Sequence, residues 1–257
     1  MAGRGGDELW KPFRVAPASA AVLMDFDGTL APIVDDPDAA RPVEGAGELL
    51  GALAERFGLV GVLSGRPVTF LQRWLPPSVV LSGLYGLEVV SGGARHDHPG
   101  GGVWREVIDD VAAVSRASGP AGMRIEPKGL SLTLHYRGEP SLETEVRAWA
   151  AKQAERSGLA VRAARMSVEL HPPIDVDKGT ALRDLAAPYE AVCFMGDDVG
   201  DLPAFDALDA LAAEGRATVR VGVHSDEAPP ELLARADIVV PSPQAALALL
   251  RQLNSRN

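Results

Sequence analysis

The sequence predicts an α/β protein in which a Rossmann-like parallel-sheet core is interrupted by a smaller inserted α+β domain. Short apolar runs alternate with helix-like segments at both ends of the chain, and this rhythm is typical of parallel strands joined by crossover helices. In the middle of the chain, apolar and polar residues alternate within strands, which is typical of an antiparallel sheet with one exposed face. The 257 residues suffice for two domains of ordinary size.

The first part of the sheet core is expected before residue 97. Strands are predicted in "AAVLMDF", "LVGVLSG" and "VVLSGLYG", because each is a short apolar run of the length of a buried strand. Helices are predicted between them, in "PVEGAGELLGALAERF" and "PVTFLQRWL". The order strand, helix, strand indicates parallel pairing.

The second part of the core begins after residue 175, where the same rhythm returns. Helices are predicted in "DKGTALRDLAA", "DLPAFDALDALAAEG", "PPELLARA" and "SPQAALALLRQL". Strands are predicted in "AVCFMGDD", "ATVRVGV" and "DIVV". We therefore expect one sheet domain, built from residues 20–96 and 174–257.

The inserted domain is predicted over residues 97–173. After a stretch rich in glycine, histidine and proline come a charged helix, "WREVIDDVAAVSRAS", and two alternating strands around "MRIEPKGLSLTLHYRG". A long helix, "LETEVRAWAAKQAERSG", and the strands "AVRAA" and "SVELH" complete it. Residues 1–19 are predicted to form a flexible N-terminal tail.

Composition narrows the classes of function. The formal net charge is −10 and the isoelectric point is near 5.0, so a nucleic acid or an anionic membrane would be repelled on average. The single cysteine, Cys193, lies in an apolar run and is expected to be a buried core residue. The first twenty residues do not resemble a secretory signal, and no run approaches the ~18 apolar residues that span a bilayer. A cytoplasmic location is expected.

Polar residues follow several predicted strands at the point where each strand ends. In an open parallel sheet, ligands bind beyond the carboxyl ends of the strands, so these residues are candidates for a site. A further candidate is a lysine at the first position of a predicted helix. The candidates are Asp25 with Asp27, Ser64 with Arg66, Lys178, and Asp197 with Asp198.

The acidic candidates predict a metal site. Asp25 and Asp27 are two residues apart on an extended chain, so both point to the same side, and Gly28 permits a sharp turn after them. Two carboxylates about 5 Å apart repel by about 3 kcal/mol at an effective dielectric constant of ~20. Asp197, Asp198 and Asp201 would add to that repulsion. A hard divalent cation with oxygen ligands, most naturally Mg²⁺, would relieve it.

The same residues predict a receptor for a phosphoryl group. A cation, the ammonium group of Lys178, the hydroxyl of Ser64 and the backbone N–H groups near Gly28 and Thr29 are all suited to phosphate oxygens. A carboxylate can also act as the nucleophile that forms an aspartyl-phosphate. The segments "DFDGTL", "SGR", "DKG" and "GDDVGD" resemble, in order, the four motifs of the haloacid dehalogenase superfamily of phosphatases.

The middle segment narrows the resemblance. "RIEPKGLSLTLHYR", with "SGLYGLE" before it and "VELHPP" after it, resembles the trehalose-6-phosphate phosphatases. The resemblance implies a haloacid dehalogenase-like core with a cap domain, and Mg²⁺-dependent hydrolysis of trehalose 6-phosphate through an aspartyl-phosphate in trehalose biosynthesis. It implies a small sugar phosphate as substrate and a functional link to a trehalose-phosphate synthase. The chain departs from the family's usual acidic motif at Leu202, where the family has glutamate.

The resemblance also implies roles for individual residues. Asp25 would be the nucleophile and Asp27 the general acid and base. Arg66 would either reach the site or cap the helix that begins at Pro67, and His135 and Arg137 follow the family motif without an assigned contact. The implied catalytic residues are Asp25, Asp27, Ser64 and Lys178. The implied substrate contacts are Thr29, Arg66, Arg124, Glu126, Lys128, Ser131 and Glu169. The implied metal residues are Asp25, Asp27 through its backbone carbonyl, Asp197, Asp198 and Asp201.

Two other functions are compatible with these motifs. The chain could be a phosphatase or a phosphomutase of the same superfamily that acts on a different sugar phosphate. It could also be a catalytically silent sugar-phosphate sensor, although the residues of the catalytic motifs are all present.

Overall fold

The computed structural model describes residues 5–34, 36–164, 166–225 and 228–255. It divides into two compact units, one formed by Met1–His96 with Val176–Asn257 and the other by Asp97–Asp175. The sequence predicts residues 97–173 for the insertion, and the smaller unit comprises Asp97–Asp175. No helix in the described ranges is both long and apolar enough to cross a bilayer.

The larger unit is built on one mixed sheet, whose described strands run in the order β12-β11-β10-β1-β2-β3-β4-β5. Neighbouring strands from β12 to β3 pair in parallel, and β4 runs antiparallel to β3. The strands are β1 (Ala20–Met24), β2 (Leu59–Leu63), β3 (Val80–Gly83), β4 (Glu88–Ser91), β5 (Ala94–Asp97), β10 (Ala191–Gly196), β11 (Ala217–Val223) and β12 (Ile238–Val240).

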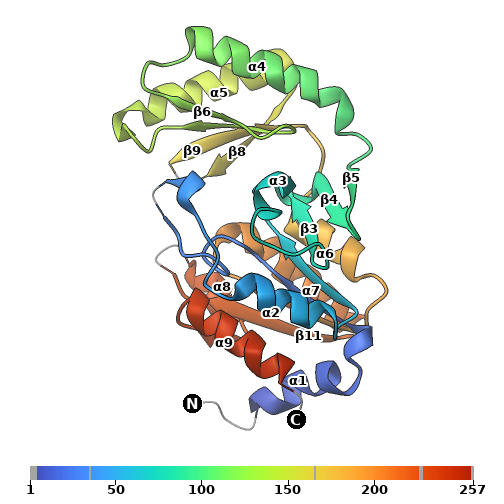
Figure 1. Ribbon diagram of the computed structural model, residues 1–257. Helices are drawn as coiled ribbons and strands as arrows, with labels where there is room; N and C mark the ends of the chain where they lie inside the picture. The colour runs from blue at the N-terminus through green and yellow to red at the C-terminus, as the bar shows by residue number, and fades with distance from the viewer. Residues whose placement is uncertain (1–4, 35, 165, 226–227, 256–257) are drawn as a thin grey trace. The chain divides into compact units, whose positions relative to one another are not determined.

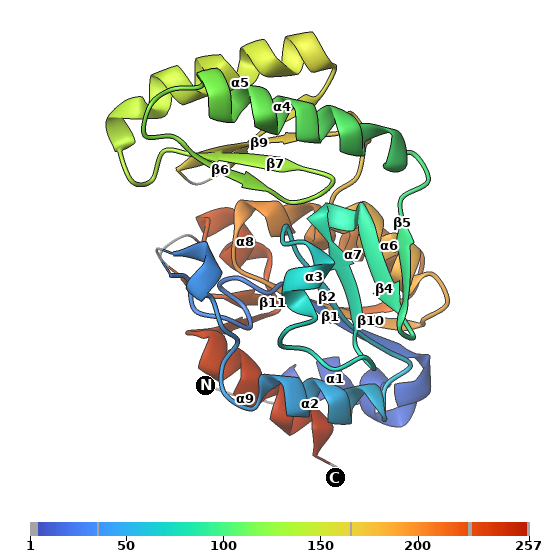
Figure 2. The same ribbon diagram turned by 45° about the horizontal axis from the view of Figure 1, so that its top comes forward.

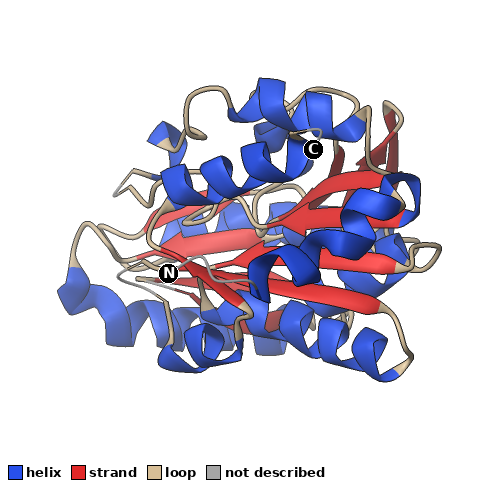
Figure 3. Cartoon of the chain, turned by 90° about the horizontal axis from the view of Figure 1, so that it is seen from below, coloured by secondary structure: helices blue, strands red, loops and turns tan. Residues whose placement is uncertain are grey.

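Helices cover both faces of this sheet, as Figure 3 shows. The strand β1 is fully buried, and successive side chains point to opposite faces, so Val22 and Met24 join one core while Ala21 and Leu23 join the other. The first core is covered by α1 (Gly5–Val15), α2 (Ala46–Ala54), α3 (Val68–Leu71) and α9 (Pro243–Asn254). The second is covered by α6 (Lys178–Ala186), α7 (Leu202–Ala213) and α8 (Pro230–Arg235). Burial on both sides explains the continuous apolar runs.

The strand order reverses at β1, and this reversal determines where a ligand can bind. After β1 the chain builds β2 and β3 on one side, and later it returns to build β10, β11 and β12 on the other side. Figure 1 labels β3 and β11, and Figure 2 labels β1, β2 and β10. Met24 is in register with Met195 of β10 and with Val62 of β2. Residues that directly follow these three strands therefore lie at one edge, at a topological switch point, where open α/β sheets bind ligands.

The prediction of a flexible tail is wrong for residues 5–19, which the structure describes and which precede the sheet. The helix α1 covers Gly5–Val15, and a short 3₁₀ turn follows at Pro17–Ser19. Trp10 and Phe13 are buried in the first core, with ring centroids 5.2 Å apart in an edge-to-face arrangement. These two aromatic side chains are three positions apart and share a helix face, so they anchor the helix to the sheet. Residues 1–4 of the predicted tail lie outside the described residues.

Truncation of Phe13 tests whether this helix is an integral part of the core. Phe13 has no exposed surface, so Phe13→Ala is expected to lower the free energy of unfolding by about 3–5 kcal/mol. Val15→Ala on the same helix removes an apolar side chain that is 76% exposed and is expected to change stability by less than about 0.5 kcal/mol. Urea titration of both variants gives the comparison, and equal stabilities would show that α1 does not contribute to the core.

The smaller unit is a four-stranded antiparallel sheet among its described residues, in the order β6-β7-β9-β8. Its strands are β6 (Arg124–Pro127), β7 (Leu132–His135), β8 (Ala160–Ala164) and β9 (Ser167–His171). Two helices, α4 (Arg105–Ser118) and α5 (Glu143–Ser157), pack on one face, as Figure 2 shows. Apolar residues of β7 and β9, such as Leu134 and Val168, point toward them. The alternate positions carry the polar side chains.

The remaining short turns connect these elements. They are the 3₁₀ turns Pro37–Ala39, Gly102–Trp104, Pro140–Leu142 and Val199–Asp201, and the turn Leu84–Gly86, whose backbone is not helical at Tyr85.

Candidate active site

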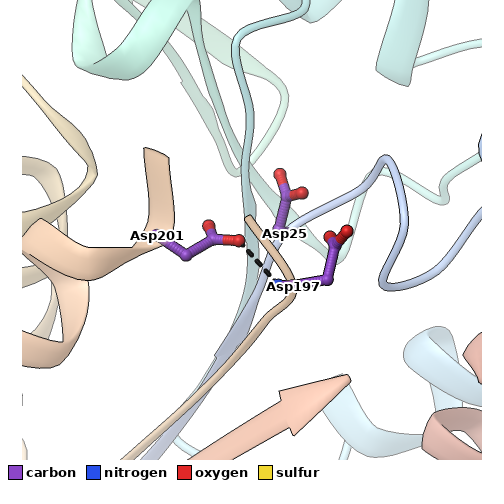
Figure 4. A group of neighbouring side chains, drawn as sticks. All are labelled: Asp25, Asp197 and Asp201. Carbon is purple, nitrogen blue, oxygen red and sulfur yellow. Dashed lines mark hydrogen bonds between the residues drawn. The ribbon is translucent and has the colours of Figure 1, made fainter. Parts of the chain in front are cut away.

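Three buried carboxylates meet at the carboxyl edge of the sheet (Figure 4). Asp25 directly follows β1, Asp197 directly follows β10, and Asp201 ends the short turn before α7. Each offers an oxygen, and these oxygens lie within 4.8 Å of one another. Asp197 and Asp201 have no exposed surface and Asp25 is 4% exposed. The strand-end positions thus bring together acidic groups that lie far apart in the sequence.

Lys178 pairs with two of these carboxylates. Its Nζ lies 2.7 Å from Asp25 Oδ1 and 2.7 Å from Asp201 Oδ1. Lys178 is the first residue of α6, and Asp177 before it caps the helix by accepting a hydrogen bond from the Thr180 N–H at 2.8 Å. A Cβ on Gly179 would lie 2.3 Å from the Pro203 carbonyl oxygen, so glycine lets α6 begin against α7. The "DKGT" sequence therefore fixes the direction of the lysine.

Asp201 holds the acidic loop together. Its Oδ2 accepts hydrogen bonds from the backbone N–H groups of Asp197, at 2.8 Å, and Asp198, at 3.1 Å. Its Oδ1 accepts from Lys178, so both oxygens are engaged. A Cβ on Gly196 would lie 2.4 Å from Asp201 Cγ, which explains the glycine at that position. Asp201 therefore orients the loop, and its Oδ1 keeps a second lone pair for a ligand.

Asp197 is oriented by two hydroxyl groups. Thr29 Oγ1 donates to Asp197 Oδ1 at 3.2 Å, and Ser225 Oγ donates to Asp197 Oδ2 at 3.0 Å. Gly28 has φ +81°, and a Cβ there would lie 2.0 Å from Asp197 Oδ2. Each carboxylate oxygen has a second lone pair, so both can still accept a ligand. Ser225 was missed by the sequence reasoning, although it lies two residues after the end of β11 at the same sheet edge.

The electrostatics of this cluster favour a bound cation. Burial, and then the charges of its acidic neighbours, raise the pKa of Asp197 to about 7. Burial and Asp201 raise the pKa of Asp198 to about 6. The pKa of Asp25 is also raised well above its usual value, chiefly by burial, while Lys178 opposes the rise. One lysine does not balance this charge, and a divalent cation would keep the carboxylates ionised.

A buried orphan atom is a second sign that a cation fits this site. Asp198 Oδ1 is buried and has no hydrogen-bond partner within the described part of the chain. A buried acceptor without a partner is rare in folded proteins. The atoms around it that could bind a metal are carboxylate oxygens, which Mg²⁺ prefers as ligands. The residues present therefore fit a hard divalent cation.

Arg66 reaches the site and contacts Asp27. Its Nε and Nη2 donate to the two oxygens of the Asp27 carboxylate, both at 2.7 Å. Its Nη1 donates to the Pro37 carbonyl at 2.7 Å, and the guanidinium lies 4.2 Å from the centre of the Phe70 ring. The guanidinium of Arg66 therefore contacts Asp27, which is itself one of the predicted site residues. Its contacts hold Asp27 in one orientation.

Glu88 caps the helix α3, which is the helix after Pro67 that Arg66 was predicted either to cap or to leave for the site. Its Oε2 accepts from the Val68 N–H at 3.0 Å, at the start of α3, and its Oε1 pairs with Arg95 at 2.6 Å. Ser64, which directly follows β2, is 1% exposed, and its Oγ accepts from the Arg66 N–H at 3.2 Å. Glu88 was not identified from the sequence, because a glutamate at the start of a strand carries no local signal of a helix cap 20 residues away.

The predicted sugar contacts all lie in the smaller unit. Glu126, Thr133, Glu169 and Arg162 are cross-strand partners and form one polar row on a single face of its sheet. Glu126 Oε2 lies 2.7 Å from His135 Nε2 and 3.8 Å from Lys128 Nζ.

The smaller unit carries further polar side chains beside this row. Arg162 Nη1 donates to Glu169 Oε2 at 3.4 Å. The hydroxyl groups of Ser131 and Thr133 are buried and have no hydrogen-bond partner among the residues that the structure describes. Arg124 is exposed at the start of β6. These groups are chemically suited to hydroxyl-rich ligands.

The chain is similar to known proteins over most of its length. Residues 23–231 match the family model described as trehalose-phosphatase. The trehalose-phosphate phosphatase of Mycobacterium ulcerans is 35% identical over 213 residues, which cover 78% of this chain and 54% of the relative. That of Mycobacterium leprae is 36% identical over 205 residues, or 73% of this chain and 47% of the relative. The chain spans about half the length of the curated relatives it matches.

Solved structures share the fold. A trehalose-6-phosphate phosphatase related protein aligns with a TM-score of 0.77 and 24% identity, over 91% of this chain and 96% of that one. The C-terminal domain of C. albicans trehalose-6-phosphate phosphatase aligns with a TM-score of 0.75 and 23% identity, over 98% and 97%. A haloacid dehalogenase-like hydrolase from Bacteroides thetaiotaomicron aligns with a TM-score of 0.63 and 14% identity, over 91% and 99%. The predicted α/β fold with a haloacid dehalogenase-like core is confirmed.

Proposed function

The chain belongs to the trehalose-phosphatase family, and on this premise we propose that it hydrolyses trehalose 6-phosphate to trehalose and inorganic phosphate. The observation that supports this most is the cluster at the switch point. There Lys178 contacts Asp25 and Asp201, and Asp197 lies beside them. A buried ammonium among carboxylates at the carboxyl edge of a parallel sheet is suited to a phosphoryl group that arrives with a cation.

Asp25 is the proposed nucleophile. Lys178 engages Oδ1 of Asp25 at 2.7 Å, which fixes the carboxylate and leaves Oδ2 for attack on phosphorus. The new bond joins Asp25 Oδ2 to phosphorus, and the bond from phosphorus to the sugar oxygen breaks. Water then attacks the phosphorus of the aspartyl-phosphate, which releases inorganic phosphate and restores the carboxylate. Ser64 and Lys178 would hold phosphoryl oxygens during both steps, as positioning and charge stabilisation require.

Asp27 is the proposed general acid and base. It would give a proton to the departing sugar oxygen and take one from the attacking water, so the proton count closes over a turnover. Its side chain is 37% exposed, so a substrate oxygen can reach it, and Arg66 holds it through both carboxylate oxygens. We therefore assign Arg66 the role of positioning Asp27, in place of the direct substrate contact first expected.

Mg²⁺ is the proposed cofactor. The residues that would hold it are Asp25 and Asp197, the backbone carbonyl of Asp27, and Asp198 and Asp201 nearby. When bound, it would offset charge on the phosphoryl oxygens and on the carboxylates. Thr29 and Ser225 would keep Asp197 turned toward it, as hydrogen bonds to metal-binding carboxylates do elsewhere. Thr29 thus supports the site through Asp197.

The smaller unit is the proposed source of sugar specificity, as a cap domain. A phosphate site alone does not distinguish one sugar from another. We propose that Glu126, Lys128 and Glu169 bind sugar hydroxyls, with Arg124 and Ser131 as further contacts. A cytoplasmic setting, and a functional link to a trehalose-phosphate synthase that supplies the substrate, belong to the same proposal.

A panel of sugar phosphates tests the proposed function. Phosphate release from purified protein is measured with Mg²⁺ and with a chelator, using trehalose 6-phosphate, glucose 6-phosphate, glucose 1-phosphate and sucrose 6-phosphate. We expect trehalose 6-phosphate to have a kcat/KM at least tenfold above the others, and the chelator to abolish turnover. Preference for another sugar would contradict the substrate assignment, isomerised sugar phosphate without free phosphate would indicate a mutase, and tight binding without turnover would indicate a sensor.

A further inference from the structure

The turn Leu84–Gly86, which follows β3, has a strained backbone. Leu84 has φ +49°, Tyr85 has φ +61° and Gly86 has φ +111°. Glycine adopts such angles freely, but for a residue with a side chain the left-handed conformation costs roughly 1–2 kcal/mol of free energy. Two such residues in succession are held only where the surrounding structure determines them, and such strain is concentrated at functional sites.

The strained turn is bonded to the loop between Ser64 and Arg66. The Leu84 N–H donates to the Arg66 carbonyl at 3.0 Å, and the Tyr85 N–H donates to the Ser64 carbonyl at 3.0 Å. Leu84 is 1% exposed, so its buried side chain anchors the turn. These two hydrogen bonds place the backbone of Tyr85 against Gly65, the residue between the two acceptors. They therefore determine the direction of the Tyr85 side chain.

The Tyr85 hydroxyl lies at that residue, Gly65. A Cβ on Gly65 would lie 2.7 Å from Tyr85 Oη and 2.8 Å from Cζ, so only glycine leaves room for the phenol. On its other side the turn meets α6, since a Cβ on Gly86 would lie 3.3 Å from the Cβ of Ala181. Tyr85 is half-buried, so part of its side chain faces solvent. The turn is thus wedged between the Ser64 loop and the helix that carries Lys178.

The helix α6 connects this turn to the catalytic cluster. Ala181, which the turn meets at Gly86, lies three residues after Lys178 on α6. Lys178 in turn lies 2.7 Å from Asp25 Oδ1. The turn that carries the phenol therefore contacts both segments that carry the groups proposed to hold the phosphoryl oxygens, the loop after Ser64 and the first turn of α6.

We propose that Tyr85 is a further substrate-binding residue, whose hydroxyl donates a hydrogen bond to a phosphoryl oxygen held between Ser64 and Lys178. This rests on the proposed function and extends it to a residue outside the four motifs. The strained turn then orients a neutral hydrogen-bond donor, the Tyr85 hydroxyl, toward the phosphoryl group. A phenol adds a donor there without adding a charge that would compete with Lys178 for the carboxylates.

Removing the hydroxyl alone tests this inference. Inorganic phosphate is titrated into the Mg²⁺-loaded wild type and into Tyr85→Phe by calorimetry. We expect Tyr85→Phe to bind phosphate about tenfold more weakly or worse, because a hydrogen bond to a charged oxygen is lost. The loss in kcat/KM should be similar for trehalose 6-phosphate and p-nitrophenyl phosphate, since only the phosphoryl group is shared. Melting temperatures of the two proteins should agree.

Tyr189→Phe is the matched control. Its hydroxyl donates to the Gly58 carbonyl at 2.8 Å, outside the site, so its removal should leave phosphate binding unchanged. Phosphate affinity of Tyr85→Phe within twofold of wild type would overturn the inference, as would absence of phosphate binding by the wild type. If the wild type binds phosphate and Tyr85→Phe does not, but trehalose 6-phosphate is not hydrolysed, then the proposed function fails and the inference stands.

Discussion

Replacing Asp25 by asparagine is expected to lower the turnover number by about 10⁴-fold or more, because the neutral amide cannot attack phosphorus. The substitution keeps the shape of the side chain, and Lys178 retains its contact with Asp201 at 2.7 Å. The buried cluster also loses one negative charge. The fold should therefore survive, and the circular dichroism spectrum and melting temperature should show a protein at least as stable as the wild type.

Steady-state kinetics on Asp25→Asn and on a surface variant make this comparison. Asp184→Asn is the control, since Asp184 is exposed on α6, the helix that carries Lys178. It should retain wild-type turnover. A turnover number for Asp25→Asn within a hundredfold of wild type, with the same metal dependence, would remove Asp25 from the nucleophile's role.

The second large effect is expected in the stability of the metal-free protein. The pKa of Asp197 is raised from its usual value to about 7 by burial and by its acidic neighbours. A carboxyl group whose pKa is raised on folding stabilises the folded state below its unfolded pKa of about 4, and that contribution is lost as pH rises through 7. In a chelator, the wild type should therefore lose stability between pH 5 and pH 8 relative to Asp197→Asn. A shift of this size corresponds to a few kcal/mol at most.

Mg²⁺ should reverse that loss. We expect Mg²⁺ at pH 8 to raise the melting temperature of the wild type and to have little effect on Asp197→Asn, because the amide is a weaker ligand and carries no charge. Thermal unfolding at pH 5 and pH 8, with Mg²⁺ or a chelator, gives the full comparison, and Asp184→Asn should follow the wild type. Parallel pH profiles for wild type and Asp197→Asn in the chelator would mean that Asp197 does not titrate as the structure indicates.

The sheet and the centre of the site could be predicted because local patterns determine them. Buried strands such as β1 and β10 are continuous apolar runs, and the polar residue after each run must lie at the carboxyl edge. The strand ends predicted that Asp25 and Asp197 lie at one edge, and the structure places their carboxylate oxygens within 4.8 Å of one another. Lys178 was predicted from the start of a helix instead, and its Nζ lies 2.7 Å from Asp25 Oδ1.

Contacts between distant segments could not be predicted in the same way. The pair of Arg66 with Asp27 depends on a bend that only the folded loop shows, and the Ser225 contact depends on the position of β11 in the sheet order. The strain at Tyr85 has no local sequence signal, because a phenol in a left-handed turn contradicts ordinary propensity. The helix α1 was missed because Trp10 and Phe13 form a short apolar face among polar residues, whose burial only the sheet provides.

Covalent transfer of the phosphoryl group to Asp25 is the central step of the proposed mechanism. The direct measurement is to mix enzyme, Mg²⁺ and trehalose 6-phosphate, quench in acid within one turnover, and locate the phosphoryl group by peptide mass spectrometry. We predict one added phosphoryl group on the peptide that contains Asp25, which disappears in a chelator and in Asp25→Asn. A phosphoryl group on another residue, or rapid phosphate release from a protein that never carries one, would contradict the account.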